Sequence, residues 1–84
     1  MAGVSCYAPP MQRDFRKPSE KHPGQYDRFR IRVRWVRSRG AYTVYLTDAP
    51  AGEEPTTVQE TPETFHALYE GLTAELEADG WTRT

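Results

Sequence analysis

The chain is poor in cysteine, histidine and long apolar runs, and each scarcity argues against a class of protein. A single cysteine, Cys6, cannot form an internal disulfide, so a small secreted domain held by disulfides is not expected. No apolar stretch approaches the roughly 20 residues of a membrane-spanning helix, and the first residues lack the apolar core of a signal peptide. We therefore predict a cytoplasmic protein without a membrane partner.

Groups that perform catalysis are equally scarce. No serine or cysteine nucleophile stands beside a base, and no glycine-rich phosphate loop occurs. His66 has Glu63 three residues before it and Glu70 four residues after it, a spacing that could give a weak metal site or a proton shuttle. A solvated helix face with ordinary ion pairs explains the same spacing more simply. We predict a protein that is not an enzyme and that has no cofactor and no metal.

The net charge of −1 hides a strong asymmetry along the chain. Residues 1–40 carry ten Lys or Arg and three acidic residues, whereas residues 41–84 carry one Arg and nine acidic residues. Such asymmetry is typical of a protein with a charged partner, and it is equally compatible with neutralisation inside the chain.

Residues 1–25 differ in composition from the rest of the chain. They contain four of the seven prolines, few aliphatic residues and no evident periodicity. We predict a disordered tail over residues 1–25 and a single small domain over residues 26–84. Tyr7, Met11 and Phe15 could form a docking motif in this tail, and an unstructured terminus is the simpler interpretation.

A two-residue period begins at Tyr26. Four apolar residues alternate with four arginines, Phe29, Ile31, Val33 and Trp35 with Arg28, Arg30, Arg32 and Arg34. This alternation predicts a strand with one buried face. A turn at residues 38–40 leads to a second predicted strand over residues 41–48. A register that pairs Trp35 with Val44 places the apolar residues of both strands on the same face.

A short third strand is predicted over residues 56–60, followed by a helix. Thr61 suits the N-cap, Pro62 the first helical position and Gly80 the left-handed C-terminal stop. Five apolar side chains fall on one side of this helix: Phe65, Leu68, Tyr69, Leu72 and Leu76. The fold class is therefore α+β, with a two- to three-stranded antiparallel sheet, β-hairpin first, packed on one face by a single C-terminal helix.

Several residues of the second strand and the helix start match a known family. Tyr42, Val44, Asp48 and Pro50 fit a "Y-x-V…D-x-P" strand, and Thr61 and Glu63 fit a "T-x-E-E-A" helix start. Over residues 29–76 the order of elements resembles the N-terminal domain of HicB-type antitoxins. The Gly-Cys pair usual after "D-x-P" is replaced by Ala51-Gly52, and the 84 residues do not include that family's C-terminal DNA-binding domain. The resemblance implies a protein that binds and blocks a small toxin.

The face opposite the predicted core is rich in arginine. Because a single helix covers one side of a sheet, the other side is open, and its arginines repeat every 6.5–7 Å or so along the strand. The predicted register places Tyr45 across from Arg34 on this side. The candidate partner-binding residues are Arg28, Arg30, Arg32, Arg34 and Tyr45.

Three interpretations of this face remain open. The first is an antitoxin-like or inhibitor-like module that binds an acidic protein, because the guanidinium fork binds carboxylates in bidentate pairs. The second is a single-stranded nucleic-acid-binding protein, with phosphates on the arginines and bases stacked on Tyr45. The third is a solvated strand face whose arginine stems discourage aggregation.

The helix also carries a strip of small residues away from its apolar side, formed by Ala67, Gly71, Ala74 and Ala78. Gly71 costs roughly 1 kcal/mol of helix stability relative to alanine. Close approach of a second backbone would explain its presence, which gives the hypothesis of a helix-mediated homodimer. A tolerated glycine on an alanine-rich face is the alternative.

Overall fold

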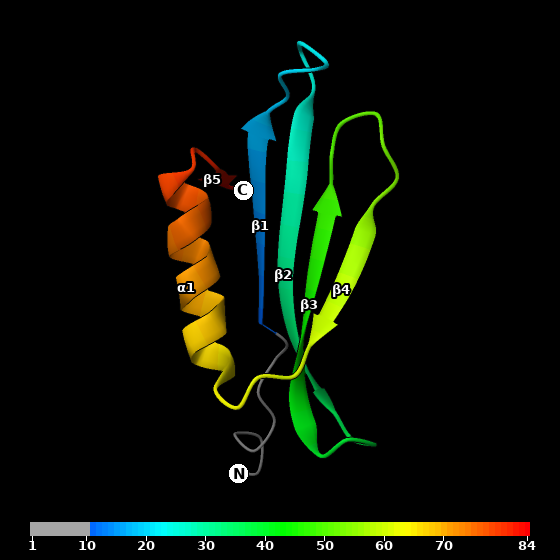
Figure 1. Cartoon of the computed structure of the whole chain (residues 1–84), viewed down its shortest axis with the longest axis vertical. Coiled ribbons are helices and arrows are strands. Elements are labelled where there is room, and N and C mark those ends of the chain that lie inside the picture. The colour runs from blue at the N-terminus through cyan, green and yellow to red at the C-terminus, as the bar shows by residue number, and fades with distance from the viewer. Residues whose placement is uncertain (1–10) are drawn as a thin grey trace, which may run out of the picture.

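The computed structural model describes residues 11–84 and shows one antiparallel sheet with one helix beside it (Figure 1). The elements are β1 (Met11–Pro18), β2 (Tyr26–Val36), β3 (Ala41–Ala49), β4 (Thr56–Glu60), α1 (Phe65–Ala78) and β5 (Thr82–Arg83). Strands β1 to β4 form a meander, and α1 returns the chain so that β5 pairs with β1. The α+β class with a C-terminal helix on one face is confirmed, but the sheet has five strands, in the order β4-β3-β2-β1-β5, and not two to three.

Strand β1 lies inside the segment predicted to be a disordered tail, and that prediction is wrong for residues 11–18. Phe15 is 1% exposed and belongs to the core. On the helix side of β1, Met11 and Phe15 alternate with Arg13 and Lys17. Because half of the inward positions are basic, the two-residue period of apolar residues is hidden in the sequence. Residues 1–10 lie outside the described residues.

The β2–β3 hairpin has a register that differs by two residues from the predicted one. Val33 lies opposite Val44, and Trp35 lies opposite Tyr42 instead of Val44. Gly40, with a φ of 62°, ends the connection, and its N–H donates to the carbonyl of Val36 at 3.0 Å. A shift of two residues keeps every side chain on its face, so the apolar residues of both strands still share one side.

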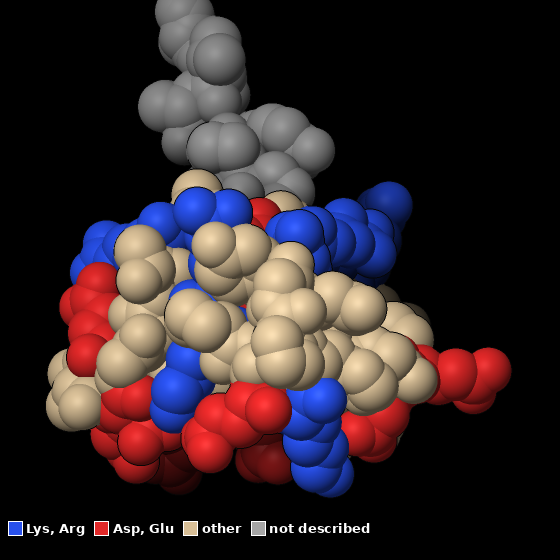
Figure 2. Space-filling model, turned by 90° about the horizontal axis from the view of Figure 1, so that it is seen from above, with Lys and Arg blue, Asp and Glu red and all other residues tan. Residues whose placement is uncertain are grey.

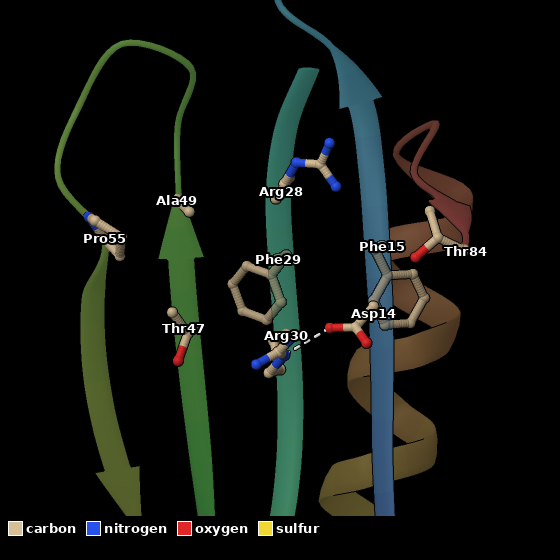
Figure 3. Close-up of a pocket in the computed structure, with 9 residues that line it drawn as sticks. All are labelled: Asp14, Phe15, Arg28, Phe29, Arg30, Thr47, Ala49, Pro55 and Thr84. Atoms are coloured by element: carbon tan, nitrogen blue, oxygen red, sulfur yellow. Dashed lines mark hydrogen bonds and ion pairs between the residues drawn. The ribbon is translucent and has the colours of Figure 1, made fainter. Parts of the chain in front are cut away.

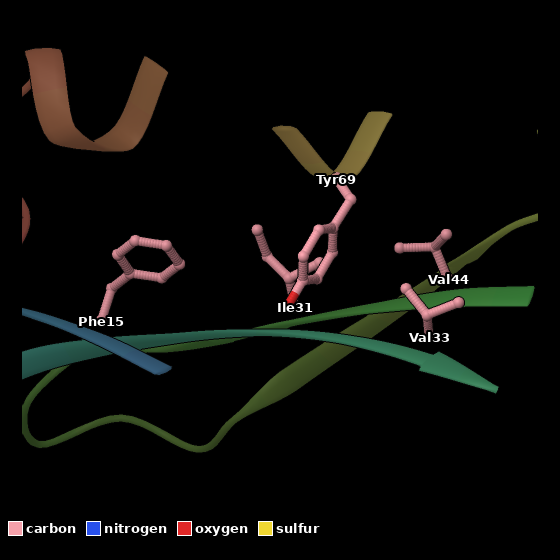
Figure 4. Packing of buried hydrophobic residues seen from close by; sticks show 5 residues of the cluster. All are labelled: Phe15, Ile31, Val33, Val44 and Tyr69. Carbon is pink, nitrogen blue, oxygen red and sulfur yellow. The ribbon is translucent and has the colours of Figure 1, made fainter. Parts of the chain in front are cut away.

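The core lies between α1 and the sheet (Figure 4). Its buried apolar members are Phe15, Ile31, Val33, Val44 and Tyr69, which come from β1, β2, β3 and α1. The partly buried residues that pack against them are Met11, Phe29, Leu46, Phe65, Leu68, Leu72, Leu76 and Trp81. All five predicted inward-facing helix residues therefore belong to the core.

The helix begins later than the sequence suggests. Its N-cap is Thr64, not Thr61, because the chain uses residues 61–64 to pass from β4 at the sheet edge to the helix layer. Gly80 has a φ of 95°, and the N–H of Trp81 donates to the carbonyl of Leu76 at 2.9 Å, so the glycine stop is present as predicted.

One end of the predicted apolar face is uncovered because the β2–β3 hairpin extends past the helix. Trp35 is 55% exposed and packs edge-on against Tyr42, with ring centroids 5.1 Å apart. Tyr42 in turn contacts Phe65 at the start of α1, with centroids 4.6 Å apart. Trp35 is thus attached to the rim of the core and not enclosed by it.

Candidate binding face

The four arginines of β2 lie on the side of the sheet opposite α1, because they alternate with Ile31 and Val33, which pack against the helix. We call this side the open face. Its other members are Gln12, Asp14 and Arg16 of β1, Thr43, Tyr45 and Thr47 of β3, and Thr57 and Gln59 of β4. Figure 3 views part of this face, with α1 behind the sheet.

The register places the tyrosine between the arginine row and the sheet edge. Tyr45 lies opposite Arg32, not Arg34, and its neighbour on β4 is Gln59. Arg34 lies opposite Thr43. All five predicted partner-binding residues are thus brought together on β2 and β3.

Two adjoining hollows run along the open face. The first, of about 360 Å³, is lined by Asp14, Arg28, Arg30, Thr47 and Thr84 among others (Figure 3). The second, of about 250 Å³, is lined by Arg30, Arg32, Arg34, Tyr45, Thr47 and Thr57. They share Arg30 and Thr47, and we call the two hollows together the arginine groove.

Asp14 is the carboxylate that β1 adds to this groove. Its Oδ1 accepts a hydrogen bond from Arg30 Nε at 2.6 Å, and its Oδ2 accepts one from Gln12 at 3.0 Å. Partial burial raises the pKa of Asp14, but these hydrogen bonds and the charges of Arg30 and Arg28 outweigh it and leave the pKa below its usual range. Asp14 is therefore ionised at neutral pH and holds Arg30 in place.

The other three arginines of the row have no such partner in the part of the chain that the structure describes. Within residues 11–84, no carboxylate lies within ion-pair distance of Arg28, Arg32 or Arg34. Among the described residues, neither the enclosed Nε of Arg32 nor Oγ1 of the fully buried Thr43 has a hydrogen-bond partner. Enclosed polar atoms are normally hydrogen-bonded, so Arg32, which lines the second hollow, keeps an unused donor among the described residues.

The basic residues on the helix side behave differently. Three ion pairs join the sheet to α1 and the residue after it: Arg13 to Glu70 at 2.9 Å, Lys17 to Asp79 at 3.3 Å and Arg83 to Glu77 at 2.7 Å. The hydrogen bond that Arg13 donates to Glu70 raises the pKa of Arg13, and the same bond lowers the pKa of Glu70. On the side of the molecule seen in Figure 2, Lys and Arg line the upper border, whereas Asp and Glu lie mainly in the lower half, with some Lys or Arg side chains between them.

Reasoning from the sequence missed the contributions of β1 to the open face. Besides Asp14, these include Arg16, whose guanidinium lies 4.4 Å from the ring centroid of Tyr26. The alternation of Gln12, Asp14 and Arg16 with inward residues was the signal that could have identified them, once β1 is recognised as a strand.

The other candidate sites are exposed. Ala67, Gly71, Ala74 and Ala78 lie on the outer surface of α1, and a Cβ added at Gly71 would meet nothing within 4 Å. The described part of the chain thus places nothing against Gly71, and the helix-mediated homodimer stays a prediction. Among residues 11–84, no three His, Cys, Asp or Glu side chains are grouped so that they could hold a metal ion.

Comparisons with family models, curated proteins and solved structures find no match to this chain. The resemblance to HicB-type antitoxins therefore remains a prediction. Within residues 11–84, α1 is the one helix, and it is neither long enough nor apolar enough to span a membrane.

Proposed function

We propose that this protein is a non-catalytic binding module that holds an acidic segment of a protein partner in the arginine groove. The observation that carries this proposal is that Arg28, Arg32 and Arg34 line a groove without a carboxylate partner among the described residues. Residues 1–10 contain no Asp or Glu, so no side chain of that segment supplies the missing carboxylate either.

The chemistry of the row suits carboxylates. A guanidinium binds a carboxylate through two parallel hydrogen bonds, and such charge-assisted bonds are stronger where water is partly excluded. Alternate residues of β2 repeat about every 6.5–7 Å, which is also the repeat of alternate side chains in any extended peptide. An extended segment with acidic residues at alternate positions would therefore meet successive arginines.

The expected mode of action is stoichiometric masking, as in an antitoxin or inhibitor. Nothing in the proposal requires bond making or breaking, and the partner's acidic segment would be covered for as long as the complex lasts. The resemblance to HicB-type antitoxins supports a small toxin as the kind of partner to test first.

Single-stranded nucleic acid is the second candidate, because Tyr45 lines the groove beside the arginines, where a base could stack. One feature favours the acidic protein over it. The Arg16 guanidinium already lies over the Tyr26 ring, 4.4 Å from its centroid, so this ring offers a base less room to stack. The negative charge of Asp14 does not distinguish the two candidates, because it would repel phosphates and carboxylates alike.

The test compares two triple variants with the same change in net charge. The first, Arg28→Gln, Arg32→Gln and Arg34→Gln, removes the unpaired arginines, and the second, Lys21→Gln, Arg37→Gln and Arg83→Gln, removes cations elsewhere. The probes are a fluorescent peptide of alternating glutamate and serine and a mixed-sequence single-stranded DNA, followed by fluorescence anisotropy. We expect the groove variant to bind the peptide at least about tenfold more weakly than wild type, since one charged hydrogen bond is worth roughly 1.5–3 kcal/mol.

The control variant should bind the peptide nearly as tightly as wild type, and the circular dichroism spectra of all three proteins should agree. Equal peptide affinity for the groove variant and wild type would contradict the proposal. Tighter binding of the DNA than of the peptide, with a steep decrease in added salt, would favour the second candidate instead.

A further inference from the structure

Strand β4 forms one edge of the sheet and is unprotected. It pairs with β3 alone, and all five of its residues, Thr56 to Glu60, are exposed. The backbone hydrogen bonds made outside the regular elements of the described chain include none from residues 56–60. The outer N–H and C=O groups of β4 are thus free to pair with another strand.

The opposite edge of the sheet, β5, has features that hinder pairing with another strand. Strand β5 has two residues, and its Arg83 forms an ion pair with Glu77. The N–H of the next residue, Thr84, donates to the carbonyl of Asp14 at 2.9 Å. Edge strands are usually blunted by lysines, prolines or bulges. Within β4 there is no proline, glycine or basic residue, and Glu60 at its end is the one charge.

We propose that two copies of this chain pair through β4, antiparallel about a twofold axis at Val58, and join their sheets into one. Residue Val58 is 49% exposed and would lie opposite its own copy. The flanking pairs would then be Thr57 with Gln59 on the open face and Thr56 with Glu60 on the helix side.

Charge and proline positions favour this register over its neighbours. A twofold antiparallel pair must be centred on a residue, so the adjacent choices are Thr57 and Gln59. Centring on Thr57 would place Glu54 opposite Glu60, which brings like charges together. Centring on Gln59 would place Val58 opposite Glu60 and bring Pro62 into the ladder against Thr56, where it cannot donate. Only the Val58 register pairs all five residues of β4 with one another, so neither Pro55 nor Pro62 has to enter the ladder.

The rest of the molecule leaves room for this arrangement. In Figure 1, α1 lies beside β1 and β5 at the far side of the sheet from β4, so the two helices would stand apart from the twofold axis. The axis is perpendicular to the sheet, which keeps both open faces on the same surface. Five strand spacings of about 4.8 Å would separate the two copies of β2, or roughly 24 Å. If the arginine groove binds as proposed, the dimer would offer two grooves side by side.

A ladder of five residues buries less than the roughly 1,200–2,000 Å² of a stable interface. The dimer should therefore form with increasing concentration and dissociate on dilution. Sedimentation equilibrium over a wide concentration range measures this for wild type, Val58→Lys and Gly71→Leu. We expect Val58→Lys, which places two ammonium groups at the axis, to weaken dimerisation at least about tenfold, and Gly71→Leu on the outer surface of α1 to leave it unchanged.

Oxidative crosslinking gives a second measurement that does not depend on affinity. In a Cys6→Ser background, Val58→Cys should yield a covalent dimer under mild oxidation, because directly opposed residues have Cβ atoms about 4.5–5.5 Å apart, close to the range that a disulfide spans. Ala74→Cys on the outer side of α1 should remain monomeric under the same conditions.

A wild type that is monomeric at every concentration would overturn this proposal. So would a dimer that survives Val58→Lys and is lost in Gly71→Leu, which would instead support the helix-mediated homodimer. Neither outcome affects the peptide-binding test above, because that test measures the arginine groove of a single chain.

Discussion

The two faces of the sheet use basic side chains in opposite ways. On the helix side, Arg13, Lys17 and Arg83 each contact a carboxylate of α1 or of the residue that follows it. On the open face, only Arg30 of the β2 row has an ion-pair partner among the described residues. The charge asymmetry between the halves of the chain thus has two origins, of which one is internal neutralisation on the helix side and the other is the arginine row of the open face, which we propose binds a partner.

The strand pairing explains why the division is so complete. Strand β1 places Arg13 and Lys17 towards α1, which carries Glu70 and is followed by Asp79, the two carboxylates that these side chains contact. The row on β2 is separated from those carboxylates by the sheet itself. The carboxylate that reaches the row, Asp14, comes from the adjacent strand. Distance, and not overall charge, therefore decides which cations are neutralised.

The largest expected effect on stability comes from Phe15, which tests whether β1 completes the core on the helix side of the sheet. Phe15→Ala should lower the free energy of unfolding by roughly 3–5 kcal/mol, because it removes a buried ring and leaves a cavity. Urea denaturation monitored by circular dichroism measures it. Val58→Ala, at a half-exposed position of β4, should cost less than about 1 kcal/mol. Equal losses in both variants would mean that β1 does not complete the core.

The next effect concerns the ion pairs of the helix side. Arg13 donates to Glu70 and to Thr73 Oγ1, each at 2.9 Å, and its guanidinium lies 4.4 Å from the Tyr69 ring centroid. Arg13→Ala should lower the free energy of unfolding by roughly 1–2 kcal/mol. Arg13→Lys keeps the charge but loses the planar guanidinium fork, so its free energy of unfolding should lie between those of wild type and Arg13→Ala. A smaller loss of stability in Arg13→Ala than in Arg28→Gln or Arg34→Gln would contradict the contrast between the two faces.

A variant of Asp14 tests its ion pair with Arg30, the one that residues 11–84 form on the open face. Because its pKa is lowered in the folded state, ionised Asp14 stabilises the fold above its ordinary pKa, and this stabilisation is lost as pH falls through the lower folded value. Asp14→Asn should therefore cost roughly 0.2–1 kcal/mol at neutral pH. It should also flatten the decrease in stability at acidic pH, as measured by thermal unfolding. Glu54→Gln, in the exposed β3–β4 connection, serves as the control, and an equally flat profile in it would contradict the prediction.

The smallest effect on stability is expected from the unpaired arginines. Arg28→Gln and Arg34→Gln should each change the free energy of unfolding by less than about 0.5 kcal/mol, since no ion pair is lost. Urea denaturation of these two variants and of Arg13→Ala compares their free energies of unfolding directly. Losses as large as that of Arg13→Ala would show that the open face is neutralised within the chain.

Much of the fold followed from local pattern. The period of two in β2, the β-rich composition of β3, the bounds of β4 and the apolar side of α1 were all predictable from the sequence, as was the glycine stop after the helix. Strand β1 was not, because two of its four inward residues are basic and become acceptable there only beside Glu70 and Asp79. The hairpin register was missed by two residues because the position of Gly40 in the turn, and not apolar pairing alone, sets it.

The candidate site divides in the same way. Alternation along β2 is a local property of the backbone, so the sequence alone determined that Arg28, Arg30, Arg32 and Arg34 share one face. Only the tertiary structure decided which of them is neutralised and which cations serve the fold, because ion pairing depends on residues that are distant in the chain and meet through β1 and α1. The same holds for the exposed β4 edge, since a strand becomes an edge only through the order in which the whole sheet is assembled.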